Sequence, residues 1–434
     1  MIKRYNECFA TKTGNCSKKA SEYLRGLIQS NKGNMSAMAE VIPDTNSQSL
    51  QHFISYSPFD EEKLKKQINE DANNKLGGEE AGLLIDDSGT PKAGNNSAGV
   101  ARQYCGKLGK VENCQVGVFA TLAKGSSYAM VDAQLYLPEE WADDKDRREE
   151  AGVPDNIEFK TKIAIAEGII EDAKTRLEFG WVGFDAGYGK SKDFLYKIGD
   201  KNLIFMADIT AKMHVYNEEP KIIEREYTRK GKKFKKLVAT IKPIKASEVI
   251  ENNKNDISLV KIREGTKGTI SANAISKKVW IWYEKSKNSR EMHLVYREDH
   301  SNPTDKKYSL SNASQDASLE ALLKMQAHRY WVERPFQEAK NTVGMDQYQC
   351  RLWAAWHRHM LLVMLAMLFM MEQKIVYGEP SNLLSCRDIV QVLAKVLPRK
   401  DRTVEDVISI IDERHKKREL AIKYHYKSSS PQGP

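Results

Sequence analysis

Two short apolar runs, each followed at once by an aspartate, constrain the fold of this chain more than any other feature. Ala81–Ile85 (AGLLI) leads directly into Asp86 and Asp87, and Phe179–Phe184 (FGWVGF) leads into Asp185. Short apolar runs bounded by polar turn residues are typical of buried strands. Because α/β folds place their chemistry at strand ends, these runs predict adjacent strands that bring Asp86 and Asp185 together.

Further strands and helices accompany these two runs. Residues 115–122 and 128–137 have strand patterns, 161–177 form an amphipathic helix, and a helix near 190–198 precedes a strand at 203–209. The order is therefore strand, strand, strand, helix, strand, helix, strand. It matches a mixed sheet of the ribonuclease H type, so we expect an α/β fold with a ribonuclease H-like core.

The remainder of the chain differs in pattern from this core. Helical spacing dominates its beginning, where a small helical module could bind DNA or simply cap the core. We expect five regions: a helical N-terminal domain (1–80), the first part of the core (81–209), a β-rich insertion (210–317), the second part of the core (318–375), and a helical C-terminal region that ends in a disordered tail (376–434).

A helix expected over 318–341 offers a third acidic group. Its polar residues fall at helical spacing on one face: Gln326, Arg329, Glu333 and Lys340. Three carboxylates could hold two Mg²⁺ ions, because hard cations prefer oxygen ligands and a two-metal site stabilises both oxygens in phosphoryl transfer. Spacing alone leaves the alternatives open. An aspartate at a strand end is more often a turn residue, and a charged stripe is usually the wet face of a helix.

The net charge of +9 favours a polyanionic partner. The densest basic stretch, REYTRKGKKFKK at 225–236, would follow a DNA backbone through contacts with phosphates. The alternative is a solvated hairpin, since runs of charge usually are solvated. Trp280 and Trp282 share one face of an expected strand. They could stack on an extruded base, although such a pair is more often part of a core.

Cysteine usage and hydropathy place the chain among ordinary cytosolic proteins. The six cysteines form none of the close pairs that a zinc site needs, and nothing indicates a disulfide framework. The N-terminus lacks the apolar run of a signal peptide. The apolar stretch 353–371 contains His357, Arg358 and His359, so we expect a buried core helix with structural histidines and no membrane span.

Several long blocks resemble the DDE transposases of bacterial insertion sequences. They follow the family order over most of residues 80–370 and comprise Leu84–Gly117, Leu135–Asp144, Trp181–Gly189 and His328–Leu362. The last block is similar to a signature of Tyr, Arg, Glu and Lys separated by two, three and six residues. Arg329, Glu333 and Lys340 match that spacing, whereas Gln326 stands where the tyrosine is expected.

The resemblance implies a metal-dependent catalytic triad of Asp86, Asp185 and Glu333. It favours Asp86 over Asp87, because Asp86 follows the strand directly, and Glu333 over Glu338. It also implies two Mg²⁺ ions per site, which Mn²⁺ can replace. In such cut-and-paste enzymes, which carry a β-strand insertion before the glutamate, activated water nicks the DNA at an element end. The freed 3′-hydroxyl then attacks a second phosphodiester.

The same resemblance implies contacts with DNA. Arg329 and Lys340 would hold phosphates near the scissile bond, or would instead be structural ion-pair partners. The other residues expected to contact DNA are Lys92, Arg102, Arg229, Lys230, Lys232 and Lys233. We expect double-stranded DNA as the partner, both element ends and target, bound by a homodimer in the bacterial cytoplasm.

Two other functions compete with an active transposase. The first is a domesticated DNA-binding protein that no longer cuts, which the complete Asp, Asp and Glu set opposes. The second is a nuclease of the same fold that cleaves DNA without strand transfer, which the triad alone does not distinguish from a transposase.

Overall fold

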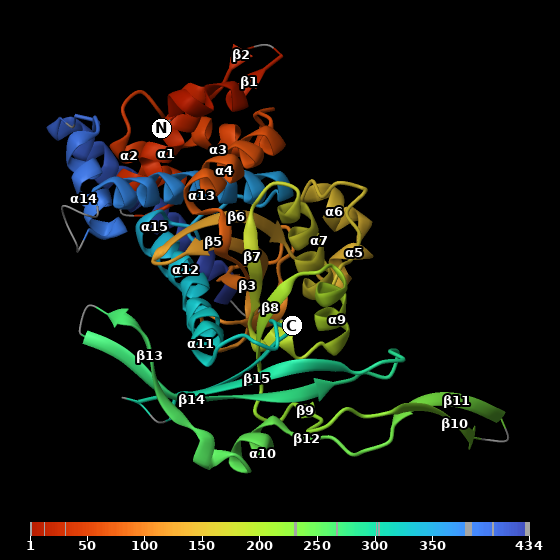
Figure 1. Ribbon diagram of the computed structural model, residues 1–434. Helices are drawn as coiled ribbons and strands as arrows, with labels where there is room; N and C mark the ends of the chain where they lie inside the picture. Colours follow the sequence, from red (N-terminus) through yellow and green to blue (C-terminus); the bar gives the residue numbers. More distant parts are fainter. Residues whose placement is uncertain are drawn as a thin grey trace.

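One mixed β-sheet of ten strands forms the centre of the molecule (Figure 1). The computed structural model describes residues 2–429 except 13, 31, 230–231, 266–267, 301, 303, 378–383 and 402. Across the sheet the order is β13-β14-β15-β16-β8-β7-β3-β5-β4, and β6 also pairs with β5. The strands are β3 (Gly78–Pro91), β4 (Ala101–Cys105), β5 (Lys110–Lys124), β6 (Ser127–Leu135), β7 (Phe179–Phe184), β8 (Ile204–Ile209), β13 (Ser258–Gly265), β14 (Gly268–Ile281), β15 (Arg290–Asp299) and β16 (Lys306–Ser311). The predicted α/β class with a mixed sheet is confirmed.

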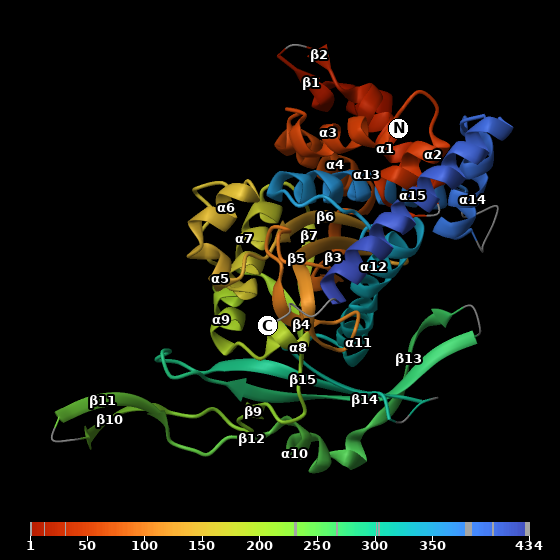
Figure 2. The same ribbon diagram turned by 180° about the vertical axis from the view of Figure 1, so that it is seen from behind.

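Helices cover both faces of the sheet near its three parallel strands, β3, β7 and β8. Figures 1 and 2 show one group on one side of the sheet and α11–α12 on the other. The first group consists of α5 (Glu139–Ala142), α6 (Lys145–Glu150), α7 (Lys162–Lys174) and α9 (Lys192–Asp200). The second consists of α11 (Leu319–His328) and α12 (Tyr330–Thr342). A side chain on a central strand therefore meets one helical layer or the other.

The strand that leads into Asp86 is longer than predicted. We expected it to end there and a polar loop to follow, but β3 continues to Pro91. The continuation is stabilised by antiparallel pairing with β5, where Asp86 lies opposite Phe119 and Pro91 opposite Cys114. The Gly, Ser and Thr residues of this segment suggested a loop, whereas long-range pairing makes it a strand. The edge strand β4, within a stretch given no element from the sequence, pairs with the beginning of β5.

The strands of residues 210–317 extend this same sheet. β16 pairs with β8, from Tyr308 opposite Ile209 to Ser311 opposite Met206, so the sheet is continuous from the core into this region. Three smaller elements precede β13: the two-stranded pair β9 (His214–Val215) and β12 (Ile244–Lys245), α10 (Ala246–Glu251) and the 3-10 helix η2 (Lys254–Asp256). A separate hairpin of β10 (Ile222–Arg229) and β11 (Lys232–Ala239) extends away from the rest of the molecule (Figure 1). The boundaries expected for an insertion domain stay a prediction.

The N-terminal helices pack on the apolar helix α13 (Trp353–Tyr377), and one of them, α4, also contacts β5 and β6 of the sheet (Figure 1). They are η1 (Ile2–Phe9), α1 (Ser17–Gln29), α2 (Met35–Val41), α3 (Ser47–Tyr56) and α4 (Glu61–Leu76), with the short pair β1 (Ala10–Thr11) and β2 (Gly14–Asn15). In the described part of the chain, α13 alone is long and apolar enough to cross a membrane. Most of it is buried inside the protein, as a core helix would be.

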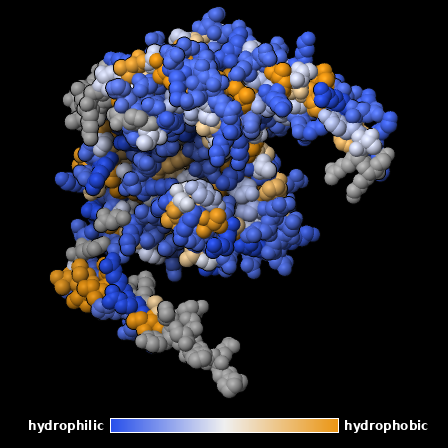
Figure 3. Space-filling model, turned by 90° about the horizontal axis from the view of Figure 1, so that it is seen from below, coloured by the Kyte–Doolittle hydropathy of each residue, from blue (hydrophilic) through white to orange (hydrophobic). Residues whose placement is uncertain are grey.

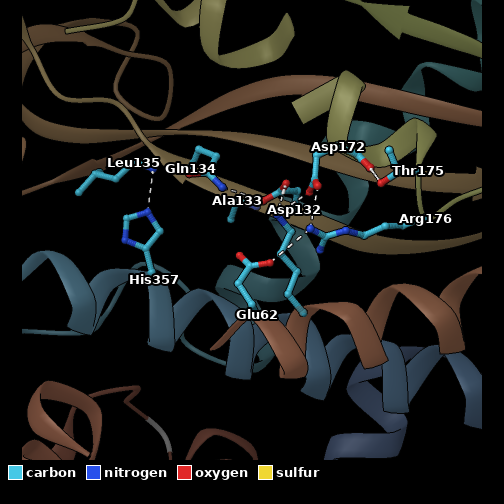
Figure 4. A network of polar contacts seen from close by, with 10 residues as sticks. Glu62, Asp132, Ala133, Gln134, Leu135, Asp172, Thr175, Arg176 and His357 are labelled. Atoms are coloured by element: carbon cyan, nitrogen blue, oxygen red, sulfur yellow. Dashed lines mark hydrogen bonds and ion pairs between the residues drawn. The ribbon is translucent and has the colours of Figure 1, made fainter. Parts of the chain in front are cut away.

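A buried ion network ties the N-terminal helices to the sheet (Figure 4). The Lys65 ammonium on α4 lies 2.6 Å from the Asp132 carboxylate on β6 and 3.0 Å from Asp172 on α7. Burial lowers the pKa of Lys65, but the two carboxylates outweigh burial and raise it. Arg176 continues the network to Asp172 and to Glu62. Lys65 and Asp132 are both buried, so removing either would deprive the other of its nearest opposite charge, and this pair holds α4 on the core.

His359 holds α13 against its neighbours as a neutral imidazole. Its Nε2 lies 3.1 Å from the Met345 carbonyl, which can only accept, so Nε2 carries the hydrogen. Nδ1 then accepts from the Tyr23 hydroxyl on α1 at 2.8 Å. Burial lowers the pKa of His359 to about 4, and it does the same to His357, two residues earlier in α13.

We predict that acid destabilises the protein through these histidines. The folded-state pKa is lower than the ordinary value near 6.5, so the unfolded chain binds more protons between pH 6.5 and 4. Stability is therefore complete above pH 6.5 and decreases as the pH falls towards 4, by about 3 kcal/mol for each histidine. Thermal unfolding between pH 4 and 7 should show a flatter profile for His359→Gln. The exposed His52→Gln is the control, and an equally steep profile for both variants would contradict the assignment.

Candidate active site

Asp86 and Asp185 follow the last paired residues of two adjacent parallel strands. The pairing of β3 with β7 ends where Ile85 lies opposite Phe184, and the next residue on each strand is the aspartate. Asp185 is also the N-cap of the short helix α8 (Ala186–Gly189), and its Oδ1 accepts from the amides of Gly187 and Tyr188. The parallel register thus brings together the two aspartates that the sequence pattern predicted to be neighbours.

Burial makes the charged forms of these two carboxyl groups unfavourable, and their mutual repulsion adds to this effect. Burial, followed by the neighbouring Asp185 carboxylate, raises the pKa of Asp86 to about 8. Burial also raises the pKa of Asp185, and the Arg329 guanidinium opposes the rise at both groups. Tyr188 lies beside them with a buried hydroxyl that has no hydrogen-bond partner among the described residues. A positive charge placed beside the two carboxyl groups would stabilise their ionised forms.

Alternation along β3 separates Asp86 from Asp87. Successive strand residues point to opposite faces, so Asp86 and Ser88 share one face and Asp87 takes the other. Asp87 pairs with Lys162 on α7. On the opposite face the Lys340 ammonium of α12 donates to the Ser88 hydroxyl at 2.8 Å. Asp86 therefore faces the helices that carry the predicted third acid, whereas Asp87 faces α7.

The predicted single helix over 318–341 is wrong, because two helices, α11 and α12, meet at Arg329. Pro335 lies inside α12, and it cannot donate to the Trp331 carbonyl one turn earlier. This loss weakens the first turn of α12 and favours an interruption of the helix close to it. Arg329 is consequently both the C-cap of α11 and the N-cap of α12, and its side chain turns towards the carboxylates.

Asp208 is a site residue that the sequence reasoning missed. The Arg329 Nε donates to its Oδ2 at 2.6 Å, and the Ser309 hydroxyl donates to its Oδ1 at 2.7 Å. Gln326 donates in turn to Ser309 at 2.8 Å, so the residue at the expected tyrosine position is part of this buried chain. A usable signal was present, since Asp208 stands near the end of a third apolar strand run. The close approach of α8 to β8 also requires Gly189, where a Cβ atom would lie 2.0 Å from the Asp208 carbonyl oxygen.

The predicted third ligand stands apart from the two aspartates. The Glu333 side chain is 54% exposed, and its Oε1 lies 3.9 Å from Nη2 of Arg329. The other candidate on α12, Glu338, accepts from the Tyr128 hydroxyl and from Nε of Arg334. Among the described residues, no group of three His, Cys, Asp or Glu side chains is close enough to hold a metal ion. Arg329 is the group whose charge acts on Asp86, Asp185 and Glu333 alike.

The other predicted DNA-contacting residues lie in three places. The Lys92 ammonium donates to the Tyr348 carbonyl at 2.9 Å and lies over the Tyr348 ring, and burial lowers its pKa to about 8. Arg102 is exposed on the edge strand β4. Lys232 and Lys233 are exposed on β11. Lys230 and the Arg229 side chain lie outside the described residues.

The tryptophan pair of the insertion is partly core. Val279 and Ile281 are fully buried, and Trp282 is 9% exposed with its indole N–H donating to the Ser286 carbonyl. Trp280 is only partly buried. Trp282 is therefore more buried than Trp280, and neither this difference nor the Trp282 hydrogen bond supports a base-stacking surface made of both rings.

Comparison with known proteins shows to which family the chain belongs. The profile of a family described as DDE superfamily endonuclease matches residues 5–269, more than half of the chain. The chain belongs to this superfamily. A relative from Microchaete diplosiphon, named probable transposase for insertion sequence element IS701, is 30% identical over 211 residues, which are 47% of this chain and 50% of the relative. The match thus spans about half the length of that curated relative.

A solved structure also shows similarity to this chain. It is a piggyBac transposase synaptic complex with hairpin DNA, determined by cryo-electron microscopy. The identity is 11% and the TM-score 0.42, over 90% of this chain and 73% of the other. The family predicted from the sequence blocks, the DDE enzymes of insertion sequences, is confirmed by the family profile and the IS701 relative.

We predict that Asp208 positions Arg329. Asp208→Asn keeps the side-chain shape but removes the closest negative charge from a guanidinium that is 11% exposed, so the free energy of unfolding should fall by about 3 kcal/mol. Ser309→Ala keeps the charge of Asp208 and removes two neutral-donor hydrogen bonds, one to this carboxylate and one from Gln326, so it should cost about 1 to 2 kcal/mol. Urea unfolding of both variants measures the difference. Equal losses would mean that Asp208 contributes no more than an ordinary buried hydrogen-bonding group.

Proposed function

We propose that this protein is a DNA transposase that binds the terminal inverted repeats of an insertion sequence. It cleaves DNA at the element ends by metal-dependent phosphoryl transfer and joins the 3′-hydroxyls to target DNA. The observation that carries the proposal is the adjacency of Asp86 and Asp185 beyond paired parallel strands, in a chain of the DDE superfamily. On this proposal the strands around them form a ribonuclease H-like core into which residues 210–317 are inserted.

The side chains at the site suit a hard divalent cation. Asp86 and Asp185 offer carboxylate oxygens side by side, the ligands that Mg²⁺ prefers. Burial first, and neighbouring carboxylates second, raise the pKa of both groups, and a bound cation would offset both effects. We assign Asp86, Asp185 and Glu333 as the ligands of two Mg²⁺ ions, which Mn²⁺ can replace. When bound, such ions activate water and stabilise the leaving oxygen of a phosphodiester.

Arg329 and Lys340 are assigned to hold DNA phosphates beside the carboxylates. Lys340 already reaches the Ser88 hydroxyl on the Asp86 face of β3. Arg329 has a buried Nη1 atom without a hydrogen-bond partner among the described residues, and this N–H is a donor available to a phosphate oxygen. Arginine suits this task because its planar fork binds phosphate oxygens in pairs. One subunit offers one such site, so handling two element ends calls for a homodimer on DNA.

We predict that Glu333→Gln abolishes cleavage and Glu338→Gln does not. Both changes remove one carboxylate from α12, but Glu338 is occupied by Tyr128 and Arg334. The substrate is a labelled duplex that carries the DNA flanking this gene, with Mg²⁺, and Glu333→Gln should reduce nicking by about 100-fold or more. Wild-type protein that binds this DNA but never cuts it with Mg²⁺ or Mn²⁺ would support the domesticated DNA-binding protein instead. Cleavage without joining of the 3′-hydroxyl to a target would support the nuclease.

We also predict that Mg²⁺ stabilises the wild-type protein through Asp86. A ligand that binds only the folded state adds about 2.7 kcal/mol at 100 times its dissociation constant, and it raises the melting temperature. Asp86→Asn should melt higher than wild type without metal, because it removes one of two repelling carboxylates, and should lose the Mg²⁺ response. Asp87→Asn, on the other face of β3, is the matched control. A full Mg²⁺ response in Asp86→Asn would place the ions elsewhere.

A further inference from the structure

The hairpin β10–β11 has two faces of different chemistry. Residues paired across an antiparallel ribbon share a face, and successive residues alternate between faces. The register pairs Arg225 with Lys236 and Tyr227 with Phe234. With Lys232, which follows the same alternation, these residues define the basic–aromatic face. The opposite face, called here the acid-containing face, consists of Glu224, Glu226, Thr228, Lys233, Lys235 and Leu237.

The charges of the acid-containing face neutralise one another. Lys235 lies 2.9 Å from the Glu224 carboxylate, and Lys233 lies 2.9 Å from Glu226. Both glutamates of the hairpin lie on this face, so Lys233 and Lys235 each already have an ion-pair partner. These exposed ion pairs leave the acid-containing face with little net positive charge to attract a polyanion such as DNA.

The basic–aromatic face carries no acidic residue of its own. Arg225 and Lys232 are exposed, and Lys236 lies 2.9 Å from Glu284, which belongs to the loop after β14. Between these cations the Tyr227 and Phe234 rings stack with centroids 5.8 Å apart, and they are 39% and 45% exposed. In the described part of the chain no second layer covers the ribbon, so the ring pair is an exposed apolar patch rimmed by positive charge. Such a patch marks an interaction surface.

Resting on the proposed transposase function, we propose that the basic–aromatic face lies in a groove of duplex DNA. A two-stranded ribbon has the width that the major groove admits. Figure 3 shows the arm standing clear of the body at the right of the view, so its approach to a rod-shaped polyanion is open. Arg225 and Lys232 bind phosphates on this arrangement, and the ring pair contacts base edges and sugars. The geometry assigns the DNA contacts to this face and leaves Lys233 with its glutamate.

The test compares two double variants that remove the same charge. Arg225→Ala/Lys232→Ala changes the basic–aromatic face, and Lys233→Ala/Lys235→Ala changes the acid-containing face. Binding of the full-length protein to a random-sequence 30-base-pair duplex is followed by fluorescence anisotropy without metal, from low to high KCl. The first variant should lower the slope of log affinity against log salt by about two, which is about a 30-fold loss at 0.15 M salt. The second should stay within about threefold of wild type.

Two further variants separate charge from shape. Arg225→Lys/Lys232→Arg keeps both charges and should keep the affinity. Tyr227→Leu/Phe234→Leu should weaken binding several-fold with an unchanged salt slope, because it removes ring contacts and no cation.

Two outcomes would overturn the proposal. Equal losses in the two charge-removing variants would mean that only the net charge matters. Unchanged DNA binding in the first variant, together with loss of self-association in sedimentation, would assign the face to a second protein chain. The assay needs neither metal nor cleavage, so failure of the catalytic assignment would show separately, as wild-type protein that binds but does not cut.

Discussion

The Arg329 guanidinium is the interaction on which the architecture of the site depends. Two carboxylates placed side by side and partly removed from water repel each other, and Asp208 adds a third negative charge close by. Arg329 compensates all three, and its pKa rises despite burial because of them, Asp208 first. Without a cation at this position the acidic residues beside β3, β7 and β8 would repel one another more strongly and would take up protons more readily.

The position of Arg329 depends in turn on how the inserted strands meet the core. β16 pairs with β8, which brings Ser309 beside Asp208, and Gln326 on the following helix donates to Ser309. The helix is then interrupted at Arg329, so the side chain bends towards the carboxylates while Glu333 stays on the solvent side of α12. The strands of residues 210–317 therefore orient α12, the helix that carries Glu333, relative to the two aspartates.

The sequence predicted those features that depend on local pattern. Alternation and apolar runs located β7 and β8 to within a residue, and the two apolar runs that lead into Asp86 and Asp185 predicted that these residues are neighbours. It failed where pairing between distant segments decides the structure: β3 continues through a glycine- and serine-containing stretch because β5 pairs with it. The roles of the two aspartates and of Glu333 stay predictions, since residue types and spacing do not reveal whether an exposed glutamate closes on a metal.

The hydrogen-bond partners of Asp208 distinguish it from Asp86. Like Asp86 and Asp185, Asp208 follows an apolar strand run, yet it pairs with an arginine and a serine. Each oxygen of Asp208 accepts a hydrogen bond from a side chain, whereas Asp86 accepts one from the adjacent backbone amide and faces another acid. The hydrogen-bond partners, and not strand position, therefore separate Asp208, which we predict to be a positioning residue, from Asp86, which we propose as a metal ligand. Those partners come from β16, whose pairing with β8 no local pattern of the sequence defines, and from the interruption between α11 and α12, which Pro335 favours.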